Sequence, residues 1–343
     1  KNKITWQLPV TPIALELPNE LIPAEVLDNN DTAKWDLFAT AIPEMRTWFR
    51  TMYGMELPGI RVWPLDQNSS LYAFYTYQIR LKDVQLASGT IYKDYLFCPD
   101  ATAESMTQAG IDILKIKEPE FKLHGKGVWI HESFREILDE KNLRYWSDPL
   151  KHVMQHLQSV LENNMTLFFS MQQLADTLDT WRKNGHEETI DTLFAKDAAI
   201  KMVRLGKIIR CLLEEKIPVT NAKAILDYCS TEGLKKDDIQ DDLQNIRALL
   251  RSDIIKTTAA HIAADMPAKI EDISACWLHN DNGKIFMQAA PQDVQEWLAG
   301  FREFVGDNAS VEIVRIKDRQ QRRFIKKIMQ LEYPKIEVIE NFD

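Results

Sequence analysis

Glycine is scarce in this chain, with only 12 glycines among 343 residues, about half the share found in an average protein. This shortage argues against glycine-rich barrels, collagen-like segments and long flexible linkers. Apolar residues make up 45% of the chain and charged residues 27%, so a sizeable core can form and extensive disorder is excluded. The composition favours a folded, helix-rich protein, long enough for about two to four domains.

Cysteine is also rare, and the four cysteines form no Cys-x-x-Cys pair. Zinc ribbons and thioredoxin-type redox pairs are therefore excluded, and scattered thiols are typical of a cytosolic compartment. No apolar run is long enough to span a membrane, and no signal peptide opens the chain. We expect this region to be soluble. Because it begins with Lys1 rather than Met, we also expect it to be part of a longer protein.

An excess of acidic residues gives the chain a formal net charge of −9. Sequence-independent binding to nucleic acid needs clustered Lys and Arg, so we expect no nucleic-acid partner. One basic run nevertheless stands out near the C-terminus, on a predicted helix. It could contact an acidic partner or form a solvated helix face. Its members are Lys317, Arg319, Arg322, Arg323, Lys326 and Lys327.

Hydrophobic periodicity divides the first three quarters of the chain into distinct parts. Alternation predicts a strand at Ile13–Leu17 and further strands between Ile60 and Ile91, and residues 34–54 read as a helix closed by Gly54. A compact insert with short strands follows. From 142 to about 256, apolar residues recur at helical spacing, which predicts an antiparallel helical bundle.

The last part of the chain returns to alternating strands and helices. Ser274–Leu278, Val311–Ile316 and Ile336–Ile339 read as strands, and 291–305 and the segment after 318 read as helices. This order predicts a small open sheet backed by helices, an α/β sandwich.

Together these parts predict an α+β fold with several subdomains. We expect a mixed α/β first subdomain with a small inserted α/β subdomain, then a helical bundle and a C-terminal α/β sandwich. The predicted boundaries are 1–92 with 142–167 for subdomain 1, 93–141 for the insert, 168–256 for the bundle and 257–343 for the C-terminal subdomain.

A search for catalytic and metal-binding patterns finds nothing specific. His152 and His156 lie four residues apart on a predicted helix, but Val153 stands where a metalloprotease motif requires Glu, and no third ligand is evident. No nucleophile-elbow motif surrounds any serine. We therefore predict no catalytic residues, no metal and no cofactor.

Several short motifs occur in order along the chain, and a resemblance depends on their order rather than on any single motif. They are Tyr53-Gly54-Met55-x-Leu57-Pro58-x-Ile60-Arg61-Val62, Leu86-Ala87-Ser88-Gly89, Glu118-Pro119-Glu120-Phe121, Val128-Trp129-Ile130, Asp148 with Val153-x-x-His156-Leu157, and Leu212-Leu213-x-Glu215-Lys216-Ile217-Pro218-Val219. In this order, from about residue 10 to the end, they resemble the cytoplasmic domain of the type III secretion export-gate family (FlhA/SctV, FHIPEP). The segment 311–342 resembles the ending of the virulence-type SctV proteins, which favours them over flagellar FlhA.

The resemblance implies a function without chemistry. Family members form a nine-membered ring beneath the secretion pore, dock chaperone–substrate complexes and help to switch between substrate classes. The implied partners are such complexes, gatekeeper proteins, stalk proteins of the ATPase complex and further copies of the chain. The implied location is the cytoplasmic domain of a bacterial inner-membrane protein, anchored through an N-terminal domain absent from this sequence. An uncharacterised enzyme or a generic adaptor on the same scaffold remains the alternative.

The resemblance also implies candidate binding residues. A hydrophobic dimple between the first two subdomains falls on Glu118, Phe121 and Gln155, although the family has Thr where this chain has Gln155. Phe121 could be an apolar anchor for a partner, or it could pack between subdomains. Trp129 could contribute to the dimple, or it could belong to the core.

Ring contacts in this family lie mainly on the first and third subdomains. Arg204, Lys207 and Arg210 are therefore candidates for the oligomer interface, or they form the solvated face of the bundle.

Overall fold

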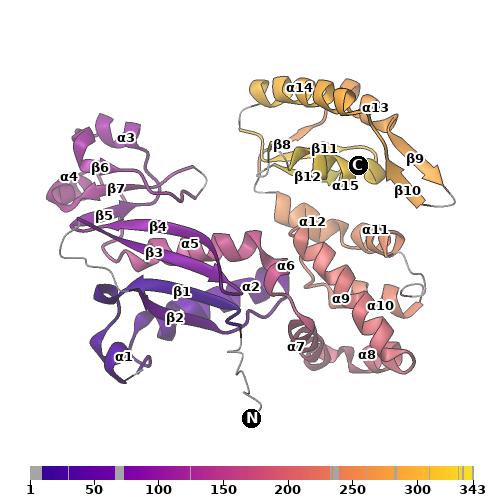
Figure 1. Cartoon of the computed structure of the whole chain (residues 1–343), viewed down its shortest axis with the longest axis horizontal. Helices are drawn as coiled ribbons and strands as arrows, with labels where there is room; N and C mark the ends of the chain where they lie inside the picture. The colour runs from indigo at the N-terminus through magenta and orange to yellow at the C-terminus, as the bar shows by residue number, and fades with distance from the viewer. Residues whose placement is uncertain are drawn as a thin grey trace, which may run out of the picture. The chain divides into compact units, whose positions relative to one another are not determined.

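The computed structural model describes most of the chain and divides it into two compact units, residues 1–235 and 236–343, each described here by itself (Figure 1). The described residues are 10–29, 31–65, 73–123, 125–231, 234, 239–259, 261–281, 284–308, 310–330, 332–333 and 336–341.

The first unit begins with a mixed sheet whose strand order is β2-β1-β3-β4. Strand β1 runs parallel to β2 and antiparallel to β3, and β3 pairs antiparallel with β4. Strand β1 is buried at nearly every position because it has neighbours on both edges. The bounds are β1 (Ile13–Pro18), β2 (Ile60–Leu65), β3 (Phe74–Leu81) and β4 (Val84–Tyr92), with helices α1 (Ala24–Asn29) and α2 (Ile42–Tyr53) between β1 and β2.

A small inserted part follows β4 and has a core of its own. Its antiparallel sheet has the order β5-β7-β6, and its core includes Leu96, Val128, Ile130 and Leu138. The chain then returns to the first sheet through helix α5 (Leu150–Asn163), which contacts β3 and β4. The insert contains β5 (Tyr95–Cys98), α3 (Ala103–Gln108), β6 (Ile116–Lys117), β7 (Val128–His131) and α4 (Arg135–Glu140).

Helices complete the first unit, and residues 239–256 of the predicted bundle belong to the second unit. Leu205, Ile208, Ile209, Leu212 and Leu213 form a buried stripe on the longest of them. The bounds are α6 (Met165–Phe168), α7 (Met171–Trp181), α8 (Glu187–Phe194), α9 (Ala198–Glu214) and α10 (Ala222–Thr231).

Gly54 joins the helical part to the first sheet region. It ends α2 in the left-handed conformation, with φ of 70°, and a Cβ atom there would lie 2.9 Å from the backbone nitrogen of Thr220. The backbone N–H of Val219 donates to the carbonyl oxygen of Tyr53. Glycine is required at this position both for its conformation and for the close approach of two chain segments.

The second unit contains a parallel sheet of order β12-β11-β8 and an antiparallel hairpin of β9 and β10. Its hydrophobic core includes the large side chains of Trp297, Phe301, Ile325 and Met329. The overall α+β fold class is therefore confirmed. The bounds are α11 (Gln240–Leu249), α12 (Arg251–Thr258), β8 (Ala263–Asp265), α13 (Ala268–Ala275), β9 (Leu278–Asp281), β10 (Lys284–Met287), α14 (Pro291–Asp307), β11 (Ile313–Ile316), α15 (Arg319–Met329) and β12 (Glu337–Glu340).

The predicted strand Ser274–Leu278 is wrong, because most of it belongs to helix α13 and the turn after it. Ile270, Ser274 and Trp277 are buried at spacings of four and three residues, which is the period of a helix rather than that of a strand. The hydroxyl of Ser274 donates to the carbonyl oxygen of Glu271. A strand begins only at Leu278.

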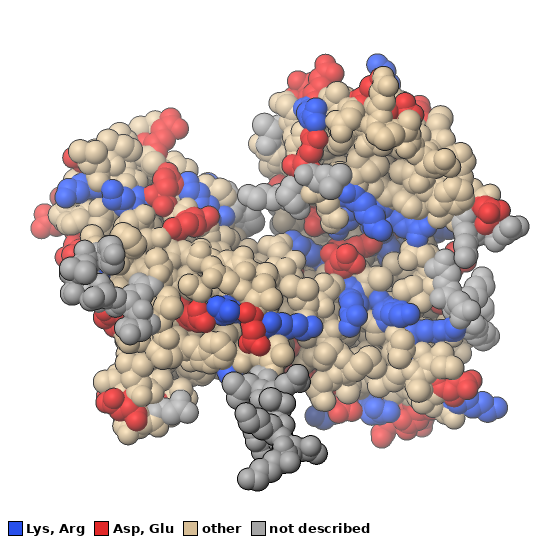
Figure 2. Space-filling view, viewed as in Figure 1, with Lys and Arg blue, Asp and Glu red and all other residues tan. Residues whose placement is uncertain are grey.

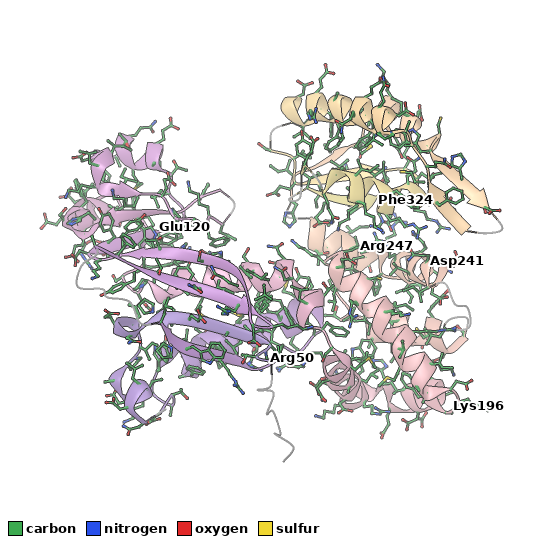
Figure 3. All side chains as sticks on the ribbon, in the orientation of Figure 1. Arg50, Glu120, Lys196, Asp241, Arg247 and Phe324 are labelled. Atoms are coloured by element: carbon green, nitrogen blue, oxygen red, sulfur yellow. The ribbon has the colours of Figure 1, made fainter. Side chains whose placement is uncertain are left out.

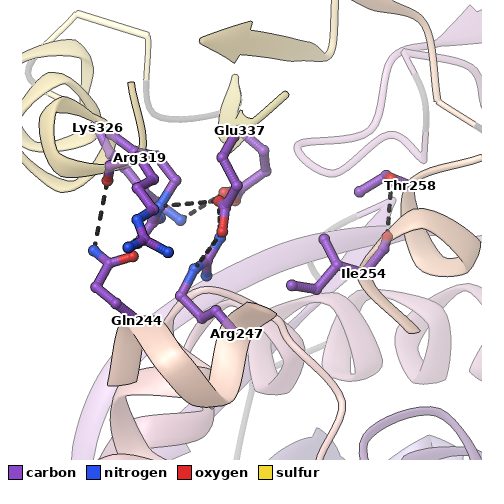
Figure 4. A network of polar contacts seen from close by, with 9 residues as sticks. Gln244, Arg247, Ile254, Thr258, Arg319, Lys326 and Glu337 are labelled. Atoms are coloured by element: carbon purple, nitrogen blue, oxygen red, sulfur yellow. Dashed lines mark hydrogen bonds and ion pairs between the residues drawn. The ribbon is translucent and has the colours of Figure 1, made fainter. Parts of the chain in front are cut away.

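A buried network of charges links α11 to α15 and β12 within the second unit (Figure 4). Glu340 accepts two hydrogen bonds from the guanidinium of Arg247, and Arg322 lies 3.2 Å from the same carboxylate. Both arginine side chains are almost completely buried. Lys326 forms an ion pair of 2.6 Å with Glu337. Two members of the basic run, Arg322 and Lys326, are therefore buried within the second unit and do not belong to a solvated helix face.

Replacing Glu340 with Gln tests this network. The two buried guanidinium groups would lose their shared carboxylate, so the free energy of unfolding should fall by about 3–5 kcal/mol. Urea denaturation measures the change. The matched control is Glu332→Gln, which breaks an exposed Arg302–Glu332 pair in the same unit and should leave the midpoint nearly unchanged. Equal effects of the two substitutions would contradict a stabilising role for the buried network.

Candidate functional site

The loop after β6 lies against the edge of the first sheet. The Glu120 carboxylate accepts hydrogen bonds from the backbone N–H of Thr90, at 2.9 Å, and from the Thr90 hydroxyl. Figure 3 shows Glu120 beside β4. Pro119 is buried, and Glu118 forms an ion pair with Lys122. These contacts fasten the inserted part to β4 and determine where the next residue, Phe121, lies.

Phe121 is half-buried and stacks on the imidazole of His156 from helix α5. The ring centroids are 4.6 Å apart and the ring planes are 4° from parallel. On another side of the imidazole, the Tyr77 hydroxyl and Nδ1 of His156 share a hydrogen bond of 2.8 Å. Residues from strand β3, helix α5 and the insert therefore meet around one buried histidine.

Gly89 makes room for the Tyr77 ring. The two residues face each other across β3 and β4, and a Cβ atom at Gly89 would lie 2.4 Å from the Tyr77 hydroxyl oxygen. Any other residue at this position would displace the Tyr77 ring. A glycine in β4 thus allows Tyr77 to reach helix α5.

A second histidine, His152, lies one helical turn before His156 and is enclosed by aromatic rings. Its centroid lies 4.1 Å from that of Phe97 and 5.3 Å from that of Trp129. Among the described residues, neither nitrogen of the His152 ring has a hydrogen-bond partner, and the same holds for Nε1 of Trp129. His152 therefore serves as a packing element between the insert and α5.

Burial keeps both imidazoles neutral at ordinary pH. It lowers the pKa of His152 to about 3, with a further decrease from His156. It also lowers the pKa of His156 to about 4, against an opposing effect of the Glu120 carboxylate. Burial raises the pKa of Tyr77, so this side chain remains a hydroxyl. The site is an uncharged aromatic cluster suited to packing rather than to proton transfer.

No group of three or more His, Cys, Asp or Glu side chains within the described part of the chain is placed to hold a metal ion. Within the same residues, no helix is both long enough and apolar enough to cross a membrane.

The FHIPEP family matches residues 1–342, almost the whole chain. The chain belongs to the FHIPEP family. This family consists of protein-secretion components rather than known enzymes, which confirms the predicted family and the predicted non-enzymatic class.

Individual relatives of the FHIPEP chain are distant. The hypersensitivity response secretion protein HrcV of Ralstonia nicotianae is 24% identical over 271 residues, covering 76% of this chain and 36% of HrcV. The invasion protein InvA of Salmonella typhimurium is 22% identical over 307 residues, covering 86% of this chain and 42% of InvA. The chain thus spans well under half the length of these two relatives.

A solved structure of the CdsV protein of Chlamydia pneumoniae has the same fold. The TM-score is 0.79 at 18% identity, and the match covers 98% of this chain and 94% of that chain.

The predicted docking residues of the FHIPEP chain lie in different environments. Phe121 is half-buried, Gln155 is half-buried on α5, and Glu118 is exposed. Trp129 is fully buried, with an exposed fraction of 0%. The expectation that Trp129 contributes to a docking surface is therefore corrected, because its indole packs beneath the surface against Phe97 and His152.

Sequence reasoning missed the residues that support Phe121. Tyr77 belongs to none of the sequence motifs, Glu120 occurs only as a motif member, and His156 is considered only as a motif member and as one of two histidines that could bind a metal. The one available signal was Gly89, a glycine inside a strand, which often marks a close approach of another group.

The predicted ring-contact residues lie along α9 of the FHIPEP chain. Lys207 is exposed. Arg204 donates to the carbonyl oxygen of Leu234, and Arg210 donates to that of Phe169 at 3.0 Å. Two of the three side chains therefore also bind backbone within their own unit. Their role in a ring stays a prediction.

The low histidine pKa values predict acid sensitivity. The unfolded chain binds protons below about pH 6.5 while the folded site does not, so stability should be complete above that pH and fall as the pH drops towards 4. The substitution His152→Phe removes one of these groups, and the loss of stability between pH 7 and pH 4.5 should become smaller.

Urea midpoints at the two pH values measure this effect. Because Phe has no ring nitrogens to bury without a partner, the variant should be at least as stable as the parent at pH 7. The same substitution at the exposed His279 provides the baseline. A pH dependence identical to that of the parent would rule out the proposed origin.

Proposed function

We propose that copies of the chain form the cytoplasmic ring of a virulence-type type III secretion export gate, and that this ring docks chaperone–substrate complexes. Membership of the FHIPEP family and the similarity to HrcV and InvA support the secretion role. The proposed location is the cytoplasmic side of the bacterial inner membrane, with the anchor in another part of the full-length protein.

The proposed ring has nine copies of the chain. Two solved structures with the same fold, EPEC SctV-C and the EscV cytosolic domain, are described as nonameric, with TM-scores of 0.69. A further structure with this fold is a complex of CdsV with CdsO. We extend this pattern to an ATPase-complex stalk protein and a gatekeeper as partners of this chain.

The half-buried ring of Phe121 is the observation that carries the docking proposal. It presents an aromatic face on a buried support, which is how aromatic anchors at protein interfaces are held. Strands β3 and β4 beside it contain few charged residues, and the face shown in Figure 2 carries few charges over these strands. Gln155 and Glu118 would add polar contacts around this apolar centre.

Phe121→Asp tests the docking surface. Removing a central aromatic anchor usually costs about 1–3 kcal/mol of docking free energy, and the added charge should increase this loss. The affinity should therefore fall roughly tenfold or more. Calorimetry with a chaperone–substrate complex from the same organism's secretion system measures it. Thermal unfolding should change little, because the ring is only half-buried.

The matched control is Leu114→Asp, at an apolar residue of the same insert with an exposed fraction of 75%. It should leave the affinity unchanged. Unaltered affinity of Phe121→Asp would refute the assigned surface, and an equal loss of folding would identify Phe121 as core.

The ring proposal has a separate test. Negative-stain images of the concentrated chain should contain nine-membered rings, and Lys207→Glu should raise the concentration needed for assembly about tenfold or more, because the reversed charge is repeated at each contact. Lys269→Glu, at an exposed position of α13, is the control. Rings that persist unchanged in Lys207→Glu would exclude this face of α9 as the interface.

A further inference from the structure

We infer that Tyr77 and His156 are positioning residues, which hold the Phe121 ring in one orientation before a partner arrives. The inference rests on the proposed docking function, and it adds the reason why the anchor can bind without first becoming ordered. The residues concerned come from strand β3, helix α5 and the insert.

The orientation of His156 is held from the side of the sheet. An imidazole can rotate about its bond to Cβ unless a polar partner selects one angle. The hydrogen bond of 2.8 Å between Nδ1 and the Tyr77 hydroxyl provides that partner. The Tyr77 ring is itself fully buried and rests against Gly89, so it has little freedom to move.

The orientation of Phe121 follows from that of His156. The two rings are almost parallel, and their centroid distance of 4.6 Å is that of direct stacking. If the imidazole turned, this stacking would be lost. Successive contacts from Gly89 to Tyr77, and from His156 to Phe121, therefore restrict the orientation of the half-buried Phe121 ring.

The backbone at Phe121 is held independently. The carboxylate of Glu120, the preceding residue, bonds to Thr90 on the sheet edge, and Pro119 restricts the chain one step earlier. Both the backbone and the side chain of Phe121 are thus fixed in the free protein. Ordering a flexible side chain on binding weakens affinity, so a prearranged ring favours docking.

The substitution Tyr77→Phe removes the hydroxyl and keeps the ring over Gly89. The probe is 4-fluorophenylalanine incorporated at position 121 and observed by fluorine NMR in the free chain. The parent should give one narrow resonance, and Tyr77→Phe should broaden it or split it into several. Docking of the chaperone–substrate complex should weaken about threefold to tenfold.

Tyr53→Phe is the matched control, because the Tyr53 hydroxyl donates to Glu162 elsewhere in the same unit. It should destabilise the chain to a similar degree without changing the fluorine resonance or the docking affinity. This control separates positioning from a general loss of stability.

An unchanged fluorine resonance in Tyr77→Phe would overturn the inference, whatever happens to binding. If Tyr77→Phe changes the resonance but neither the variant nor the parent chain binds a chaperone–substrate complex, the positioning role would be supported and the docking function rejected. The two proposals therefore fail separately.

Discussion

The hydrogen bond between Tyr77 and His156 connects the sheet of the first unit to the helix that returns from the insert. It lies in a buried region where an unpaired hydroxyl or ring nitrogen would be costly. This hydrogen bond joins two neutral groups, because burial disfavours a charged imidazole at His156 more than the Glu120 carboxylate favours one. The same burial that makes His156 a poor acid or base makes it a good support for Phe121.

The second unit uses the opposite solution to link its elements. There Arg247 and Arg322 converge on Glu340, so charges rather than aromatic rings join α11 to the C-terminal sheet. Such a network is sensitive to substitution, because removing one member leaves the opposite charge buried without a partner. Aromatic stacking in the first unit requires no charged groups, but the rings must still fit closely against one another.

Several features could be predicted from sequence because they depend on local patterns. The helix ending at Gly54, the strands on either side of it and the long apolar stripe of α9 follow from periodicity and from the conformational freedom of glycine. Phe121 could be proposed as a docking residue only through the ordered motifs of the family. The predicted strand at Ser274–Leu278 is wrong because a short continuous apolar run, here 275–278, fits a strand as well as a buried helix end when its neighbours are not known.

The amino-acid sequence alone determined the α+β class, the family and the absence of any recognisable catalytic motif, since these depend on residue type and on order along the chain. Only the tertiary structure decided that Trp129 lies beneath the surface, that Arg322 and Lys326 turn inward, and that Tyr77 supports His156. The physical reason is that these outcomes depend on contacts between residues far apart in the chain: Tyr77 and His156 are separated by 79 positions, and no local pattern records which distant side chain will fill a given space.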